Sequence, residues 1–210
     1  MPPIIDIHIH IQPLHMFKPA PLELIKRGRK DYAEVEKYSY DAKAFLKFLD
    51  TLGIERAGLI NYVSPELMGF TPEVNDWIAR YCSEAPDRLL AFGSVHPCAV
   101  ADPAAEVERI AKLGIRALKL HPSHQGITPN SYRNGFGPLA AVYECAEAAG
   151  LPLMIHTGTS IFPGARNVHA QPMLCDDVAV DFPRLTIILA HGGRPLWMEE
   201  AFFLVRRHPK

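Results

Sequence analysis

"DPAAEVERIAKLGIRALKL", residues 102–120, contains a helix followed directly by a strand. Asp102 is a predicted N-cap, Pro103 suits the first turn of a helix, and Gly114 is a typical stop. The apolar run 115–120 begins immediately after this glycine. This stretch therefore predicts one complete helix-to-strand unit of an α/β fold.

The same junction recurs in "LGIERAGLI" (52–60) and "AGLPLMIH" (149–156). Helices that alternate with short apolar strands predict a parallel sheet covered by helices. The expected strands are 3–9, 56–61, 89–95, 115–120, 151–155 and 185–190, and the clearest helices are 41–53, 102–114 and 138–150. Residues 11–40 form the longest region expected to be irregular.

This pattern gives about six β-α units. A doubly wound sheet could stop at six, whereas an eight-stranded barrel would need about two more units. The order of the strands in space would distinguish these two folds.

The composition is that of an ordinary globular domain, with 210 residues, net charge −1, 48% hydrophobic and 21% charged residues. It contains no cluster of Lys and Arg, which gives no support for binding nucleic acid or an anionic membrane. The first residues do not read as a signal peptide, and no apolar run approaches the length of a membrane span. The four cysteines are widely spaced, as expected of reduced thiols in a cytoplasmic protein.

Histidines gather where the expected strands end. In "IIDIHIH" (4–10), His8 and His10 share one face, because side chains alternate along a strand. His156 and His191 end the fifth and sixth strands. A strand face exposed to solvent would explain His8 and His10 alone. It would not explain why His156 and His191 also end strands, because the carboxyl ends of parallel strands meet at one edge of the sheet. The four histidines therefore predict a metal site.

Four motifs carry a resemblance to a known family: "DIHIH" (6–10), "ALKLHP" (117–122), "PLMIHTGT" (152–159) and "FPRLTIILAHGG" (182–193). From residue 4 to its end, the chain resembles the amidohydrolase superfamily. The similar branch is the amidohydrolase-related group that includes aminocarboxymuconate-semialdehyde decarboxylase and resorcylate decarboxylase. The resemblance implies a distorted TIM barrel, (β/α)8, with one divalent metal.

In that family the strand-one pair and the strand-five histidine bind the metal, which implies His8, His10 and His156 as ligands. The strand-six histidine, here His191, contacts the metal-bound water and acts as acid and base. The usual metal is Zn2+, and Mn2+, Fe2+ or Co2+ could replace it.

The family also uses an aspartate at the end of strand eight, which would fall beyond Lys210. Asp176, Asp177 and Asp181 lie in a predicted helix and are poor replacements. We expect residues 1–210 to form a single amidohydrolase-like barrel domain that lacks its last two β-α units. Alternatively, six units could form an altered, inactive structure.

Lys119 allows three interpretations. It shares a face with Ala117 and His121, in a segment similar to the strand-four lysine of dihydroorotase-like enzymes, where a carbamylated lysine bridges two metals. It could instead bind a substrate carboxylate or form a salt bridge. We expect His121 to touch substrate, and Arg166 could clamp an anionic substrate.

Asp6 could orient a ligand histidine or make a structural hydrogen bond.

The leading functional prediction is a metal-dependent hydrolase of a small carboxylate, amide or lactone. The alternatives are a decarboxylase of a small aromatic or muconate-type acid and a catalytically incomplete metal-binding or assembly subunit. The expected partner is a small-molecule substrate, and an assembly of identical chains is compatible with this prediction.

Overall fold

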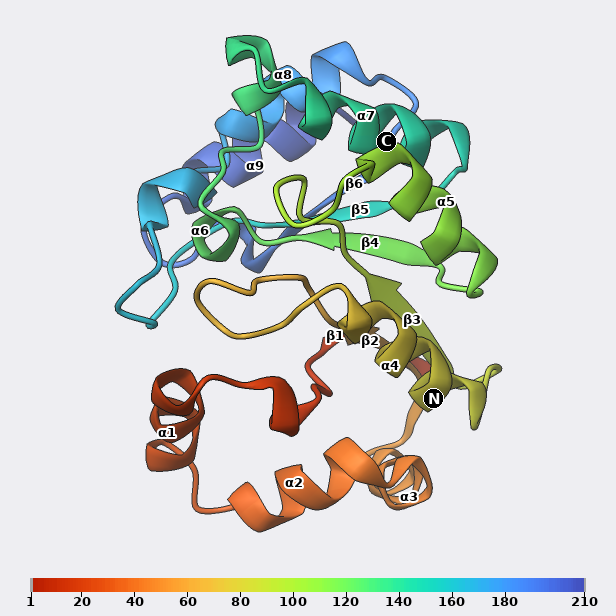
Figure 1. The fold of residues 1–210 in the computed structure, drawn as a ribbon. Helices are drawn as coiled ribbons and strands as arrows, with labels where there is room; N and C mark the ends of the chain where they lie inside the picture. The colour runs from red at the N-terminus through yellow and green to blue at the C-terminus, as the bar shows by residue number, and fades with distance from the viewer. Residues whose placement is uncertain (1, 210) are drawn as a thin grey trace.

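Six parallel strands form one sheet in this computed structural model, which describes residues 2–209. The strands run through the middle of the molecule and the helices lie around them (Figure 1). The strands are β1 (Ile4–Ile9), β2 (Ile54–Ile60), β3 (Leu89–Gly93), β4 (Ala117–Leu120), β5 (Leu153–His156) and β6 (Ile187–Ala190). All six lie within three residues of the predicted positions.

The order of the strands decides between the two predicted architectures. Each strand pairs in parallel with the next one along the chain, from β1 to β6 without a reversal. A doubly wound sheet would contain a point at which this order reverses. The sheet is therefore an open TIM-barrel-like arrangement of six β-α units, with β1 and β6 as its edges, which confirms the predicted fold class.

The three helices that the sequence predicts most clearly, α3, α5 and α7, begin and end within two residues of the expected positions. Asp41 and Asp102 are N-caps whose carboxylates accept hydrogen bonds from backbone amides three residues further on. The helices are α1 (Pro19–Arg27), α2 (Tyr32–Tyr40), α3 (Ala42–Thr51), α4 (Glu73–Ser83), α5 (Pro103–Lys112), α6 (Pro122–Gln125), α7 (Gly137–Ala148), α8 (Leu174–Asp181) and α9 (Met198–Arg207).

The prediction for residues 11–40 is wrong. This segment contains a 3-10 turn at Leu14–Met16 and the two nine-residue helices α1 and α2. Pro21 is the buried residue of α1 and Ser39 that of α2. Neither helix is followed directly by a strand, so this segment lacks the helix-to-strand junction on which the prediction of the other helices depended.

Two apolar layers pack against the sheet. The larger layer contains residues of the strands and of helices α3, α4, α5, α7, α8 and α9, and it fills the space between them. The smaller layer contains strand residues and lies on the inner face of the sheet: Ile60, Phe92, Ala117, Met154 and Ala190. On β4, Leu118 and Leu120 point to the outer layer, so Lys119 points to the inner face.

Both edge strands leave apolar side chains in water. Ile4, Ile5 and Ile7 of β1 are 52%, 53% and 46% exposed. A cavity of about 730 Å³ lies beside β6 and is lined by residues of α8, β6 and α9, including Ile187 and Leu189. Between residues 2 and 209, no helix is both long and apolar enough to span a membrane.

Candidate active site

Five histidines come together at the carboxyl edge of the sheet. We call them the histidine cluster: His8, His10, His121, His156 and His191. The ring centroids of His8 and His10 are 5.1 Å apart, and those of His8 and His191 are 4.7 Å apart. His156 lies 4.7 Å from His191 and 3.9 Å from His121. The sequence-predicted candidate histidines thus lie close together, and the ring of His121, which we expected to touch substrate, stacks on that of His156.

The end of β1 places two imidazole nitrogens side by side. His8 Nε2 and His10 Nε2 are 3.2 Å apart. Two nitrogens bound to one zinc ion at about 2.0–2.1 Å in tetrahedral geometry would be about 3.3 Å apart. The pair therefore has the spacing that a shared metal ion requires.

The Asp6 side chain accepts a hydrogen bond from the backbone of β1 and not from an imidazole ring. Its Oδ1 accepts a hydrogen bond from the backbone amide of His8 at 2.9 Å. Of its two predicted roles, the described contacts fit the structural hydrogen bond.

His156 has a ring nitrogen without a partner. Its Nε2 is buried and has no hydrogen-bond partner within residues 2–209. A buried nitrogen without a partner is costly unless a ligand completes it. In the same part of the chain, however, no three His, Cys, Asp or Glu side chains converge closely enough to enclose an ion. The residues fit a divalent metal in their chemistry, and the His8–His10 pair has ligand spacing.

The histidines are neutral at pH 7. Burial first, and the charge of Lys119 second, lower the pKa of His8 to about 3, that of His156 to about 2 and that of His191 to about 4. Metal ligation and proton acceptance both require a neutral imidazole. The cluster is therefore in the protonation state that its predicted roles need.

Lys119 lies below the cluster on the inner face of the sheet, in register with Met154 of β5. It is 1% exposed, and its Nζ has no hydrogen-bond partner among the described residues. Burial lowers its pKa from the usual 10.5 to about 7. The described contacts do not include the predicted salt bridge, and the substrate-binding and metal-bridging interpretations stay open.

The turn after β6 aims His191 into the cluster. His191 adopts a left-handed backbone conformation with φ 66°, which is rare for a residue other than glycine. Thr157 ties this turn to β5: its Oγ1 donates to Ala190 O at 2.8 Å and accepts from Gly193 N at 3.2 Å. Strain of this kind is often found at functional sites.

The structure also reveals a row of side chains that the sequence analysis missed, here called the relay: Tyr62, His124 and Ser160. The Tyr62 hydroxyl lies 3.0 Å from His124 Nδ1, and His124 Nε2 lies 2.7 Å from Ser160 Oγ. The His124 ring stacks on His121 with a centroid distance of 3.7 Å. The three residues are far apart in the sequence, so only the "HPSH" spacing of His121 and His124 could have pointed to the relay.

Comparison with known proteins agrees with this arrangement. The family model described as Amidohydrolase matches residues 5–210. The chain belongs to the amidohydrolase family. The predicted resemblance is thereby confirmed, and so, at the level of the family, is the prediction of an enzyme. No match was found among curated proteins.

Solved structures similar to this amidohydrolase share its fold. An uncharacterised TIM-barrel protein from Bordetella bronchiseptica is 23% identical with a TM-score of 0.74, covering 98% of this chain and 72% of that one. A 5-carboxyvanillate decarboxylase from Novosphingobium aromaticivorans, solved with bound manganese, is 16% identical with a TM-score of 0.64, covering 97% and 70%. The 4-oxalomesaconate hydratase from Rhodopseudomonas palustris is 21% identical with a TM-score of 0.61, covering 99% and 69%.

Arg166 does not join the cluster. Its side chain is exposed in the loop after β5, and its backbone amide donates to Ser123 O at 3.0 Å. A role in substrate binding stays a prediction.

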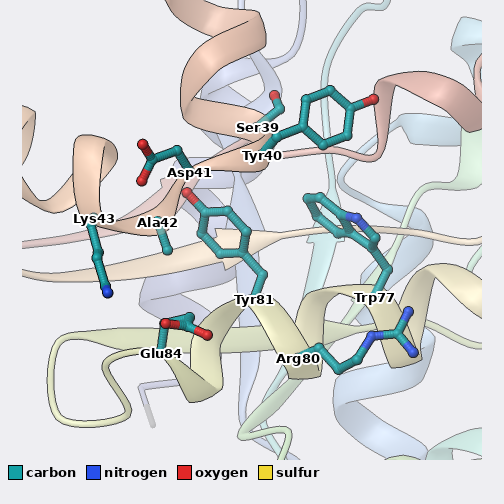
Figure 2. A pocket seen from close by; sticks show the side chains of 9 residues that line it. All are labelled: Ser39, Tyr40, Asp41, Ala42, Lys43, Trp77, Arg80, Tyr81 and Glu84. Carbon is teal, nitrogen blue, oxygen red and sulfur yellow. The ribbon is translucent and has the colours of Figure 1, made fainter.

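A groove of about 410 Å³ lies elsewhere on the amidohydrolase, between the α2–α3 junction and α4. Figure 2 shows Trp77 and Tyr81 of α4 pointing toward the segment around Asp41, with Arg80 on the same helix pointing to the side. Its lining includes no member of the histidine cluster or of the relay. The groove is therefore separate from the candidate active site.

Gly158 controls how closely the loops after β5 and β6 approach. Its φ is +122°, and a Cβ at this position would lie 2.4 Å from Arg194 O. We expect Gly158→Ala to lower the free energy of unfolding by about 2–3 kcal/mol, because strain and a backbone clash add. Urea unfolding would measure this loss. Gly150→Ala is the matched control, since Gly150 also has a positive φ (+63°) but open space around it; equal losses in the two variants would contradict the steric argument.

Acid should destabilise the fold before carboxylates titrate. His124 and His156 are 5% and 6% exposed, and burial is the main cause that lowers their pKa values, to about 3 and about 2. Below pH 6.5 these histidines are protonated in the unfolded chain but stay neutral in the folded chain. The free energy of unfolding therefore falls as the pH decreases. Each such histidine contributes up to about 1.4 kcal/mol per pH unit. Urea midpoints measured from pH 8 to pH 5 should decline below about pH 6.5; a constant midpoint would contradict this expectation.

Proposed function

We propose that this amidohydrolase is a metal-dependent carboxy-lyase that removes CO2 from a small aromatic or muconate-type acid. The observation that carries the proposal is the environment of Lys119. Its Nζ is buried and has no hydrogen-bond partner, and therefore no carboxylate in contact, among the described residues. A buried amine without an anionic partner on the protein favours a substrate that brings its own negative charge, because that charge would stabilise the protonated amine.

His8, His10 and His156 would hold the metal. Nitrogen-rich sites suit zinc, whereas the similar decarboxylase from N. aromaticivorans was solved with manganese. When bound, a divalent ion supplies Lewis-acid polarisation of substrate oxygens. A second ion would require Lys119 as a bridging ligand, and it is not part of the proposal.

Two other residues would act on the substrate directly. Lys119 would bind the substrate carboxylate, since its Nζ lacks a partner on the protein. His191 is neutral at pH 7 and exposed, which suits a group that carries a proton between solvent and the substrate. In the overall reaction the bond from carbon to carboxylate breaks, carbon keeps the electron pair and takes a proton, and CO2 leaves.

Hydrolysis is the second candidate. His191 lies between His8 and His156, where it could equally accept a proton from an attacking water. The predicted hydrolase and the carboxy-lyase would use the same residues, so only substrates can separate them.

The test is a substrate panel on the metal-loaded chain, with hydroxybenzoates, muconate-type acids, lactones and amides. We expect CO2 release from an acid, lowered at least about a hundredfold in His191→Asn with bound metal unchanged. Cleavage of a lactone or amide without CO2 release would favour hydrolysis. Metal binding without any turnover would favour the non-catalytic metal-binding subunit.

A further inference from the structure

Two buried side-chain donors without hydrogen-bond partners belong to neighbouring strands of the sheet. One is Lys119 Nζ on β4, described above. The other is the hydroxyl of Ser94, the residue directly after β3. Ser94 is 0% exposed, and its Oγ has no partner in the described part of the chain. A buried polar atom of this kind is costly, and it is often completed by a ligand or water.

The pattern along β3 turns the Ser94 side chain to the inner face of the sheet. Phe92 belongs to the inner apolar layer, whereas Val95 belongs to the outer one. A Cβ on Gly93 would also lie on the outer side, 3.0 Å from a side-chain carbon of Ile110 on α5. Because side chains alternate along an extended segment, Ser94 points inward between these two outward positions.

The register of the sheet brings Ser94 beside Lys119. Gly93 on β3 pairs with Leu118 on β4. One residue further along both strands, Ser94 lies opposite Lys119, and paired strands are about 4.8 Å apart. Both side chains leave the inner face, so the serine hydroxyl and the longer lysine side chain border the same space below the histidine cluster.

Asn75 of α4 holds the backbone of Ser94 in place. Its Oδ1 accepts a hydrogen bond from Ser94 N at 2.8 Å, and its Nδ2 donates to Ser94 O at 2.9 Å. The same Nδ2 donates to Glu106 Oε1 at 3.1 Å, which joins this contact to α5. With its backbone fixed, Ser94 needs only rotation of its side chain to aim the hydroxyl, so the donor is largely preorganised.

A carboxylate has the chemistry to complete both groups at once. A hydroxyl can donate one hydrogen bond and a protonated amine up to three, whereas a carboxylate only accepts them. Within residues 2–209, no acidic side chain lies within hydrogen-bond distance of either Ser94 Oγ or Lys119 Nζ. The acceptor with a negative charge must therefore come from a ligand.

We propose that Ser94 and Lys119 form one carboxylate subsite, in which the Ser94 hydroxyl donates to an oxygen of the carboxylate that Lys119 binds, with Asn75 as a positioning residue. This inference rests on the proposed function, because it adds a binding residue on β3 for the carboxylate of the proposed substrate. The two atoms have almost no contact with solvent, so side chains above them must move for the ligand to enter. Once bound, the carboxylate would be shielded from water, which strengthens hydrogen bonds to it.

Calorimetric titration of the metal-loaded chain with benzoate tests the subsite. We expect the dissociation constant to increase about ten- to a hundredfold in Ser94→Ala, the effect of losing one hydrogen bond to a charged group. Benzamide, a neutral molecule of the same shape, should bind the wild type at least about tenfold more weakly than benzoate. Ser39→Ala is the matched control and should bind benzoate like the wild type, because Ser39 is also buried but lies on α2, where its Oγ donates to Val35 O.

Two further measurements separate ligand binding from a structural role. The urea midpoint of ligand-free Ser94→Ala should equal or exceed that of the wild type, because the hydroxyl has no protein partner to lose. In a double-mutant cycle with Lys119→Met, the combined increase in the dissociation constant should be smaller than the product of the two separate increases, because both residues bind one carboxylate.

Four results would overturn the proposal. Equal benzoate affinity in Ser94→Ala and wild type would show that the space beside Ser94 holds only water, and a lower urea midpoint would show that the hydroxyl has a partner on the protein. Independent effects of the two substitutions, or no benzoate binding by the wild type, would also contradict a shared subsite.

Turnover is measured separately on the same preparations. A chain that binds benzoate through Ser94 but releases no CO2 from any acid would contradict the proposed function and leave the subsite standing. Release of CO2 by Ser94→Ala with the KM of the wild type would contradict the subsite and leave the proposed function standing.

Discussion

Replacing His8 and His10 together by alanine should abolish metal binding. Loss of a single residue that only supports a metal ligand lowers affinity ten- to a hundredfold. Removing two ligands, whose Nε2 atoms lie 3.2 Å apart in the structure, should therefore lower affinity by more than about a hundredfold. Elemental analysis after dialysis against dilute Zn2+ should find about one equivalent in the wild type and almost none in the double variant.

The control for this experiment is His15→Ala, since His15 is exposed and lies outside the histidine cluster. Its metal content should equal that of the wild type. Two equivalents in the wild type would instead favour Lys119 as a bridging ligand. A folded wild-type chain without any affinity for Zn2+, Mn2+, Fe2+ or Co2+ would contradict the metal-dependent mechanism.

Lys119→Met should make the metal-free chain more stable and should impair carboxylate turnover. Burial lowers the pKa of Lys119 from 10.5 to about 7. Between these values the unfolded lysine is protonated and the folded one is not, so the wild type loses stability as the pH falls from 10.5 to 7. At about 1.4 kcal/mol per pKa unit, this cost approaches about 5 kcal/mol at pH 7. We expect methionine, which has a similar volume, to recover on the order of 3–5 kcal/mol of it.

Urea unfolding at several pH values measures this effect. The advantage of Lys119→Met should be largest at pH 7 and below and should shrink as the pH approaches 10.5, where the unfolded lysine also loses its proton. Lys112→Met, at the exposed end of α5, should change the free energy of unfolding by less than about 0.5 kcal/mol. A variant that is less stable than the wild type at every pH would show that Lys119 has a stabilising partner.

The sequence predicted the strands and the convergence of His8, His10, His156 and His191 because both depend on local patterns. Alternation along β1 places the first pair on one face, and the parallel order of the strands brings the other two to the same edge. The glycine stops and aspartate caps around α3 and α5 are equally local signals.

The relay could not be predicted in the same way. Tyr62 and Ser160 lie on loops and His124 lies in the short helix α6, and their contacts span 62 and 36 residues along the chain. Hydrogen bonds between such distant segments leave no periodic pattern in a sequence. Helices α1 and α2 were missed because neither is followed directly by a strand.

Strand β1 carries the proposed ligand His8 and is followed directly by the second, His10. It is also an edge of the sheet, with Ile4, Ile5 and Ile7 about half exposed. Edge strands unfold locally more readily than central strands, and their backbone amides are less protected from hydrogen exchange. The candidate site therefore includes one of the less stable elements of the fold. A ligand that joins His8 and His10 to His156 on β5 would link this edge to the interior across the three strands between them. Backbone amides of β1 should then exchange with deuterium more slowly after Zn2+ is added, whereas those of β6 should change little; equal slowing of both edges would show that the ion acts on the whole sheet.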